Sequence, residues 1–514
     1  MTQFFRFFSP RIALLLGALV ILTALSYAPG LSGPFVFDDI PQITENSFLH
    51  LDSLSLPALQ AAAFSYGTGE RPLSMLTFAL NHLFSGLDPF ACKLSNLLIH
   101  LTNGLLLFAL IRLLYQTPRV AASIQPDAAQ TNLIALMVTA AWLLHPINVT
   151  TVLYIVQRMT ALSALFCLLG MLLYILGRLR LDRNRRLGVA LILGSVCIAT
   201  PLAFLSKENG ILLPLYLFLI EWLLFGFAVE NARCCRRLKM LFLVMLGVPA
   251  VLAIGFFITH PGWIQDGYGN RPFTLMERVL TEPRVLWIYI KLLLLPRLSE
   301  LTLFHDDLML SSGLSVPWTT LPALLGLIGL ALSALLLRRR WPLLAFGILL
   351  FLSGHLLESS VFALEIAHQH RNNLAGNGIL LVVFPLLAGW RPGPDRRQIG
   401  LVLATILIGL YGVTTAISAS DWSSSARLAL TGVNDHPASP RWQQQAAQEF
   451  WAAYLRTEDP DQRTTLYEST RTHLLEASRL DPLAAPGSLL SILQIDSTQG
   501  HAPDSQVLAT LAVQ

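Results

Sequence analysis

Charged residues are scarce in this 514-residue sequence. Asp, Glu, Lys and Arg together make up 13% of the chain, whereas soluble globular proteins average about 25%. Hydrophobic residues account for 54% of the chain, and the mean hydropathy is +0.59. This deficit of charge argues against a water-soluble globule and predicts an integral membrane protein.

Cysteine is also scarce, and several common catalytic motifs are missing. The five cysteines form neither a disulfide framework nor a thiolate metal site. The sequence has no glycine-rich phosphate loop, no nucleophile elbow and no HExxH motif, which argues against P-loop NTPases, α/β-hydrolases and zinc proteases of that type. The formal net charge of +4 gives no indication of a nucleic-acid partner, and we expect none.

Apolar stretches long enough to cross a membrane are abundant. A spanning helix needs about 17 to 25 residues. Residues 280–296 are also apolar, but they include Arg284 and Lys291, so we expect this segment at the membrane interface or in a re-entrant loop. The third predicted span ends at His145-Pro146 and is expected to be tilted or broken. The eleven predicted spans are residues 12–29, 93–115, 132–146, 151–177, 188–206, 210–229, 239–258, 317–337, 342–357, 374–390 and 399–419.

The basic residues predict how the spans are oriented. Arginines concentrate in one set of loops, for example in residues 178–186 and 338–340, and the positive-inside rule places this set and the N-terminus in the cytoplasm. The loops 30–92 and 259–316 are then extracytoplasmic. We predict a transmembrane domain over 1–420 with interfacial helices, and a small extracytoplasmic helical domain over 421–514. Its residues 473–482 resemble the end of a tetratricopeptide repeat.

Two adjacent carboxylates follow the first span on the predicted outer side. Asp38 and Asp39 repel each other, and adjacent acids just outside a bilayer are typical of chemistry at the membrane surface. Either carboxylate is a candidate general base that takes the proton of an attacking hydroxyl. The structural alternative is a helix cap or a solvated turn.

Four cations lie at span ends on the same predicted side as the two acids. Ionisable residues at membrane depth are candidates for function, and fixed cations are needed to hold a phosphorylated lipid. The structural alternative is snorkelling of a long side chain to the headgroups. The four candidates for binding a donor phosphate are Arg71, Arg158, Lys207 and Arg371.

A third polar group is formed by His145 and by the run from Glu365 to Asn373. Glu365, His368 and Asn372 are spaced as on one face of a helix, so we expect a polar helix face lining a cavity rather than a zinc site. Glu208, His145, Glu365, His368 and His370 are the predicted pocket residues, with no metal ligand among them. His305-Asp306-Asp307 is expected to form an interfacial turn.

Several motifs together resemble the GT-C class of glycosyltransferases. They are Phe35-Val-Phe-Asp-Asp-Ile-Pro-Gln-Ile43, Arg71-Pro-Leu-Ser74, the segment from His145 to Arg158, Ser206-Lys-Glu-Asn-Gly210, and the segment from Glu365 to Asn372. Their order is similar to that in the protein O-mannosyltransferases that combine membrane spans with tetratricopeptide repeats, and in bacterial relatives, some of which are associated with type IV pilin glycosylation. The likeness extends over residues 30 to about 420.

The resemblance implies an all-α, GT-C-like enzyme of the bacterial inner membrane with a periplasmic active site. It implies a polyprenyl-phosphate sugar donor and inversion at the sugar carbon, with Asp38 or Asp39 as base. Arg158, Lys207 and Arg371 would hold the phosphate, and His145 and Glu208 would line the pocket. Only about one repeat is legible in the tail, so the acceptor (pilin, another protein or a glycan) and the sugar (mannose, arabinofuranose or another) stay open. A requirement for Mg or Mn also stays open.

Two other classes of function compete with this interpretation. An oligosaccharyltransferase would use a lipid diphosphate, for which the outer loops carry only a moderate number of cations. A transporter or flippase would show paired half-repeats with broken helices near the midplane, and no matching halves are evident in the sequence.

Overall fold

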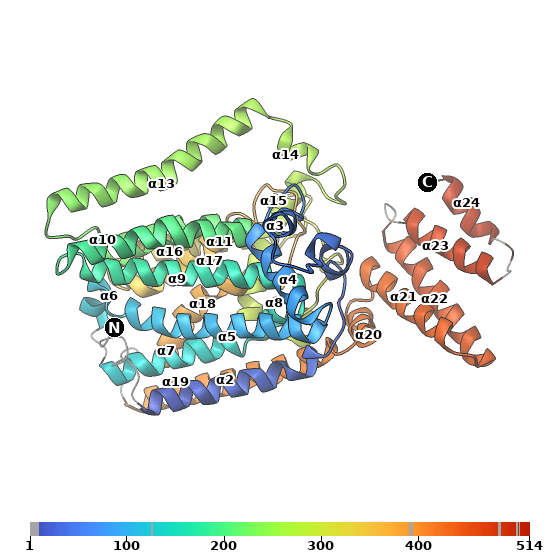
Figure 1. Cartoon of the computed structure of the whole chain (residues 1–514), viewed down its shortest axis with the longest axis horizontal. Coiled ribbons are helices and arrows are strands. Elements are labelled where there is room, and N and C mark those ends of the chain that lie inside the picture. The colour runs from blue at the N-terminus through green and yellow to red at the C-terminus, as the bar shows by residue number, and fades with distance from the viewer. Residues whose placement is uncertain are drawn as a thin grey trace.

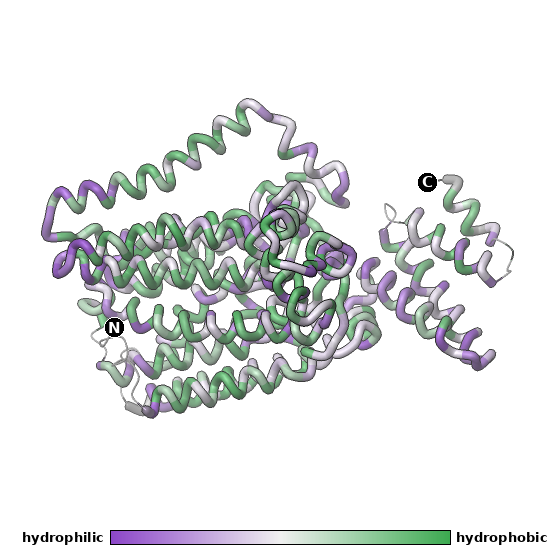
Figure 2. Tube along the Cα trace, viewed as in Figure 1, coloured by the Kyte–Doolittle hydropathy of each residue, from purple (hydrophilic) through white to green (hydrophobic). Residues whose placement is uncertain are grey.

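The computed structural model is built from helices. It describes residues 10–124, 127–389, 394–481, 485–499, 502 and 504–513, and within these ranges the only β-type pairing is an isolated bridge between Gly313 and Val316. Figure 1 shows a bundle of long, roughly parallel helices with irregular loops at one end, and a second group of helices beyond that end. Hydrophobic residues run along the bundle and hydrophilic ones gather at its ends (Figure 2). This all-α architecture is the one that the sequence predicts.

Eight helical segments of the described chain are long and apolar enough to cross a membrane. Three of the eight contain short irregular turns of helix: Ile155–Arg180 at its start, Arg185–Ser206 around residues 195–199, and Glu208–Phe225 at each end. The segments are α2 (Pro10–Leu31), α5 (Pro89–Leu114), Ile155–Arg180 with α9 (Arg158–Arg180), Arg185–Ser206 with α10 (Arg185–Gly194) and α11 (Thr200–Ser206), Glu208–Phe225 with α12 (Leu213–Leu219), α13 (Ala232–Thr259), α16 (Thr320–Leu337), and Arg397–Asp421 of α19 (Pro394–Asp421).

The sequence predicts eleven spans, three more than the eight segments that qualify in the structure. The third predicted span is broken at His145-Pro146, as expected: α7 (Ala128–Leu143) and the segment Pro146–Leu153, which ends in α8 (Val149–Leu153), meet at 51° and together make a ninth span. Two further predicted spans correspond to α17 (Pro342–Gly354) and α18 (Asn372–Leu387), which have 13 and 16 residues. At 1.5 Å per residue, α17 covers about 20 Å, less than the ~30 Å hydrocarbon core.

The short helices α17 and α18 lie inside the bundle and pack closely. A side chain on Gly347 of α17 would come within 2.6 Å of the Gly378 carbonyl oxygen of α18. Small residues are typical of such close contacts between membrane helices. The two helices therefore contribute to the bundle through packing rather than through length.

Two further helical segments lie outside the predicted spans. Residues 72–84 form α4 (Pro72–Ser85). The segment with Arg284 and Lys291 forms α15 (Leu275–Leu294), which is not among the helices that qualify as spans. Asp306 and Asp307 lie in a turn, as expected.

The region after residue 420 is helical and has a core of its own. Tyr454, Tyr467 and Leu474 are buried in this core, whereas Leu455 and Leu475 are exposed. The tetratricopeptide-like stretch lies at the end of the third of these helices, and its last residue, Pro482, lies outside the described residues. The helices are α20 (Ser425–Asp435), α21 (Pro440–Arg456), α22 (Pro460–Leu480), α23 (Ala485–Thr498) and α24 (Ser505–Val513).

Candidate active site at the loop-bearing end of the bundle

Arg71 forms the first element of the site. It is the N-cap of α4 and has a φ of 55°, a left-handed conformation that costs a non-glycine residue energy and is frequent at functional sites. Its Nε and Nη2 donate to the two carboxylate oxygens of Glu208 at 2.7 and 2.9 Å. Its Nη1 donates to the Tyr66 hydroxyl at 2.9 Å. This bidentate pair joins the first outer loop to the start of η6 (Glu208–Leu212).

A second ion pair lies next to the first in the chain. Lys207, in extended conformation between α11 and η6, places its Nζ 3.0 Å from Glu358 Oε1 and 3.0 Å from Thr160 Oγ1. Both charged residues are buried. Burial acts to raise the pKa of Glu358, but the nearby Lys207 and Arg371 outweigh it and lower that pKa. Glu358 is therefore ionised at neutral pH.

Arg371 brings a third cation to this cluster. It ends η9 (Gln369–Arg371) and donates to the backbone carbonyls of Ile366 and Glu365 at 3.1 and 2.7 Å. No carboxylate of the described chain forms an ion pair with it. Arg71, Lys207 and Arg371 thus oppose two carboxylates, and we call the five side chains the cationic cluster, because its net charge is +1. The five residues are Arg71, Lys207, Arg371, Glu208 and Glu358.

Two histidines, the half-buried His368 and the buried His370, lie beside the cationic cluster. The rings of His368 and His370 stack with centroids 5.0 Å apart. Burial and the neighbouring cations lower the pKa of each well below its usual range, so both are neutral. The Nδ1 atoms of both rings, and Glu358 Oε2, are buried without a hydrogen-bond partner among the described residues. Orphaned buried polar atoms indicate a place for water or a ligand.

The two adjacent acids have different environments. Asp39 is buried, and its oxygens accept the backbone N–H groups of Val36 (3.2 Å) and Val156 (2.8 Å). Burial raises the pKa of Asp39 to about 7 even though these hydrogen bonds oppose the shift. Asp38 is exposed, and its backbone N–H donates to the Tyr154 hydroxyl at 2.9 Å. Asp39 therefore fastens the loop to the bundle, and Asp38 is the carboxylate open to a substrate.

Tyr66 connects Asp38 with the cationic cluster. Its hydroxyl accepts a hydrogen bond from Arg71. Burial raises the pKa of Tyr66. The charge of Arg71 opposes this rise, whereas the charges of Glu208 and Asp38 add to it. The charge of Asp38 is thus close enough to act on the tyrosine that Arg71 holds.

Glu365 ties this region to the C-terminal helices. Its Oε1 accepts from Arg271 at 2.7 Å and from Arg441 of α21 at 2.8 Å. Asp306 accepts from the Ser439 hydroxyl at 2.6 Å and from the Arg441 backbone N–H at 3.2 Å. These contacts pack the start of α21 against the outer loops.

Three sequence-based expectations need correction. Arg158 does not reach the cationic cluster: it is fully buried and donates to Asn96 Oδ1 and to the carbonyls of Thr77 and Cys92. His145 does not line the site, since it caps a turn through Ile147 N–H and its Nε2 contacts the Leu293 carbonyl. The run from Glu365 to Arg371 is not an α-helix, because helix α18 begins only at Asn372.

Glu358, Tyr66 and Arg441 belong to the site but are missing from the predicted set. Glu358 follows directly after a predicted span, and an ionisable residue at that depth is the signal that would have identified it. Tyr66 and Arg441 carry no comparable signal in the sequence. Within the described residues, no group of three His, Cys, Asp or Glu side chains is placed to hold a metal ion.

The fold and this site define an all-α polytopic membrane protein with buried ion pairs at one end of the bundle. The chain is similar to protein O-mannosyl-transferase TMTC3 of Mus musculus (30% identity, covering 38% of this chain and 20% of that protein) and of Homo sapiens (30% identity, 34% and 18%). It is also similar to protein O-mannosyl-transferase Tmtc3 of Drosophila melanogaster (30% identity, 27% and 16%). The matched segments span about a fifth of the length of these relatives. No family model and no solved structure matches the chain.

Proposed function

We propose that this protein transfers one sugar from a polyprenyl-phosphate to a hydroxyl group of a protein, at the extracytoplasmic face of the membrane. The cationic cluster at the loop-bearing end of a polytopic bundle is the observation that carries the proposal. Similarity to proteins named O-mannosyl-transferases supports the reaction type. The sugar and the acceptor, including a pilin, are not distinguished by these observations.

The cationic cluster suits a lipid-linked phosphate. Its net charge is +1, and Arg371 is hydrogen-bonded to carbonyls rather than paired with a carboxylate. Fixed cations in a water-poor site stabilise the negative charge that develops on a leaving phosphate. The negative charge of a polyprenyl monophosphate is small enough for the cationic cluster to compensate. A diphosphate would leave more negative charge uncompensated. The monophosphate donor is therefore favoured.

Asp38 acts as the general base of the proposed reaction. The acceptor oxygen attacks the anomeric carbon of the sugar and transfers its proton to the Asp38 carboxylate. The bond between this carbon and the phosphate oxygen breaks, and the phosphate leaves with the electron pair. A single displacement of this kind inverts the configuration at the sugar carbon. Asp39 is a positioning residue, because it holds the loop through backbone N–H groups.

Location and domain organisation follow from the same proposal. The N-terminus lies in the cytoplasm of a bacterial cell, the protein spans the inner membrane, and Asp38 faces the periplasm. Residues 421–514 form a periplasmic helical domain that docks on the outer loops through the contacts of Asp306 and Glu365.

Separate Asp38→Asn and Asp39→Asn variants test the assignment of the base. Purified protein in liposomes is given a radiolabelled polyprenyl-phosphate sugar and a serine- and threonine-containing peptide. Asp38→Asn is expected to lower the transfer rate by roughly 100-fold or more, as for loss of a general base, with an unchanged unfolding temperature. Asp39→Asn is expected to lower the unfolding temperature as well.

Three results would contradict the proposal. Normal transfer by Asp38→Asn removes this carboxylate from the mechanism. Use of a diphosphate donor in place of the monophosphate points to an oligosaccharyltransferase. Movement of the lipid across the membrane without sugar transfer points to a flippase.

A further inference from the structure

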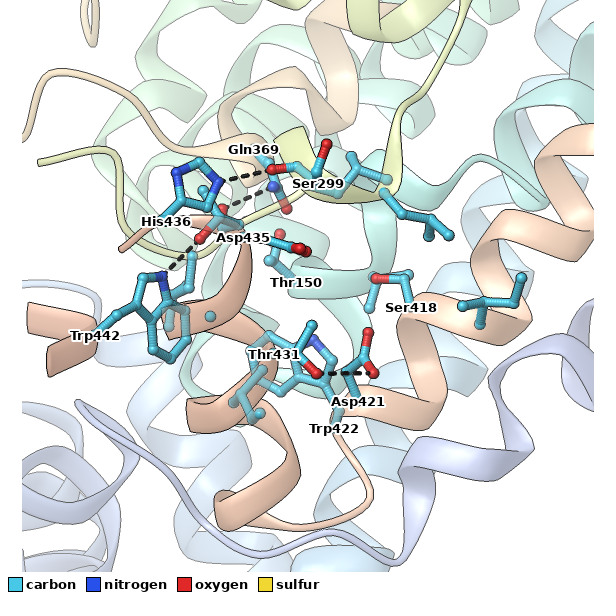
Figure 3. A pocket seen from close by; sticks show the side chains of 18 of the residues that line it. Thr150, Ser299, Gln369, Ser418, Asp421, Trp422, Thr431, Asp435, His436 and Trp442 are labelled. Carbon is cyan, nitrogen blue, oxygen red and sulfur yellow. Dashed lines mark hydrogen bonds between the residues drawn. The ribbon is translucent and has the colours of Figure 1, made fainter. Parts of the chain in front are cut away.

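A large cavity lies apart from the cationic cluster. It is lined by α8, the segment 297–303, the end of α19 and α20, and its volume is about 660 Å³. This volume is typical of small-molecule sites. Figure 3 shows Thr150, Ser418, Asp421 and Asp435 around the hollow, with Gln369 at its rim. No residue of the cationic cluster lines the cavity.

An aromatic wall separates this cavity from Asp38. Trp442 lines the cavity, and Phe37, directly before Asp38, packs edge-on against it with ring centroids 5.9 Å apart. Phe304 lies between the same residues, 5.0 Å from Phe37 and 4.8 Å from Trp442. The Trp442 indole N–H is held by Thr302 Oγ1 at 2.8 Å. The three aromatic rings thus stand between the cavity and Asp38.

The hydroxyl of Thr150 is the strongest sign that the cavity takes a ligand. Thr150 is 3% exposed, and its Oγ1 has no hydrogen-bond partner among the described residues. The side chain lines the hollow in Figure 3. An unsatisfied buried hydroxyl is unfavourable, and a polar molecule in the cavity removes this cost by bonding to it.

The polar groups of the cavity fit a ligand with several hydroxyls. Asp435 offers carboxylate oxygens as acceptors, and the Ser418 hydroxyl can both donate and accept. Asp421 Oδ1 lies 3.5 Å from the Thr431 hydroxyl and 3.5 Å from Arg427 Nε, which leaves its second oxygen as an acceptor. Asp435 itself accepts only from the neighbouring Asn434 amide, at 3.2 Å, among the described contacts. Its carboxylate thus retains capacity for a ligand.

The charges of the cavity disfavour anionic ligands. Arg297 is largely exposed and lies 3.6 Å from Glu300. His436 is occupied on both ring nitrogens, by Asp307 and by the Ser299 carbonyl. Asp421 is paired with Arg427 at 3.5 Å. Asp435 has no ion-pair partner among the described residues, and its negative charge repels phosphate and carboxylate groups. Trp422 and Trp442 add apolar ring surface, which suits the C–H faces of sugar rings.

We propose that this cavity is a binding site for a neutral, polyhydroxylated ligand, a short saccharide, and that it is distinct from the site of sugar transfer. Saccharide binding there does not depend on the transfer reaction. A saccharide already attached to an acceptor would hold that acceptor at the junction between the bundle and the C-terminal helices.

Saccharide binding to the full-length protein in nanodiscs tests this proposal by saturation-transfer NMR titration. The probes are methyl α-mannoside, mannobiose and methyl β-galactoside, with ethanolamine and inorganic phosphate for comparison. At least one saccharide is expected to bind. Ethanolamine and inorganic phosphate are expected not to bind. Asp435→Asn is expected to weaken binding by about tenfold, as for a hydrogen bond to a charged group. Thr150→Val removes a hydroxyl that makes no bond in the protein, so it is expected to weaken binding without lowering the unfolding temperature.

Asp52→Asn is the matched control, since Asp52 is an exposed aspartate that does not line the cavity. The proposal is overturned if none of the saccharides binds, or if both cavity variants bind them as tightly as the control. Binding of ethanolamine in their place also overturns it, because the two carboxylates would then serve an ammonium group. A protein inactive in transfer that still binds saccharide through Thr150 and Asp435 would refute only the proposed function.

Discussion

At the scale of single residues, side chains of the same type have different surroundings. Asp38 and Asp39 are adjacent in the chain, yet one is exposed and the other is buried against two backbone N–H groups. Lys207 and Arg158 are both buried cations, but Lys207 pairs with Glu358 and Arg158 binds an amide and two carbonyls. Residue type and position in the sequence identified these side chains as candidates for function. Their partners in the structure distinguish the remaining candidates from residues with a structural role.

The different partners of the two cations predict different effects of replacing them. Arg158→Met leaves the buried Asn96 Oδ1 without its donor, at about 1 to 3 kcal/mol for an unsatisfied group, and it removes the hydrogen bonds to the Thr77 and Cys92 carbonyls. We expect a large fall in the unfolding temperature, measured by differential scanning fluorimetry. The double variant Lys207→Met/Glu358→Gln removes both charges of a buried pair, which is often nearly neutral for stability. It is expected to keep the unfolding temperature and to raise the KM for the polyprenyl-phosphate sugar.

A normal donor KM in the double variant would exclude Lys207 from donor binding. An unchanged unfolding temperature of Arg158→Met would show that its three hydrogen bonds contribute little.

At the scale of elements, hydrophobic stretches predicted helices well, whereas short polar runs did not. The helical spacing of Glu365, His368 and Asn372 predicted a helix, but three positions are too few to establish a period. In the structure, Arg371 binds the carbonyls of Glu365 and Ile366 from the end of the 3-10 helix η9. The hydrogen bonds from the Arg371 side chain thus satisfy carbonyls that the backbone N–H groups of an α-helical turn would otherwise bind.

The contact that fastens α20 to the second outer loop is predicted to depend on pH. His436 Nδ1 lies 2.6 Å from Asp307 Oδ2 and its Nε2 lies 2.7 Å from the Ser299 carbonyl. Both partners are acceptors, so only the protonated ring donates to both. Burial opposes the charge, but Asp307 outweighs it and raises the pKa of His436. Asp435 and His305 also interact electrostatically with this ring. Burial lowers the pKa of His305 to about 4, so His305 stays neutral.

The sign of this dependence follows from linkage. A raised pKa in the folded state means that the stabilisation is complete below the unfolded value of about 6.5 and is lost as the pH rises through the folded value. Hydrogen exchange of α20 amides, corrected for intrinsic rates, should therefore show lower protection at pH 8 than at pH 6. His436→Gln should remove this difference. A difference that persists in the variant would assign the effect to another group.

At the scale of the whole molecule, the ends of many helices assemble one site. The first outer loop, the connection between α11 and η6, and the segment 355–371 meet through Arg71–Glu208 and Lys207–Glu358. Each of these segments contributes only one or two charged side chains to the cationic cluster. The bundle therefore serves as the scaffold that holds these loops together.

Cysteine labelling tests the proposed orientation of the bundle. In a background without the five native cysteines, Asp182→Cys and Asp459→Cys each place a thiol at an exposed position. Because Asp182 lies among the arginines of residues 178–186, the positive-inside rule places it in the cytoplasm. We expect a membrane-impermeant maleimide to label Asp459→Cys in intact spheroplasts, and Asp182→Cys only after permeabilisation. The reverse pattern would place Asp38 in the cytoplasm and would contradict the proposed periplasmic site.

Local sequence properties were sufficient for the helices, their order and the side on which each charged loop is expected. Hydropathy is a sum over neighbouring residues, so a single stretch is enough to identify an apolar helix. The pairing of Arg71 with Glu208, 137 positions away, and the burial of Asp39, His145 and Arg158 were settled by packing. Such contacts depend on which distant segments share a desolvated space, and the energy of a buried charge is set by its partners there.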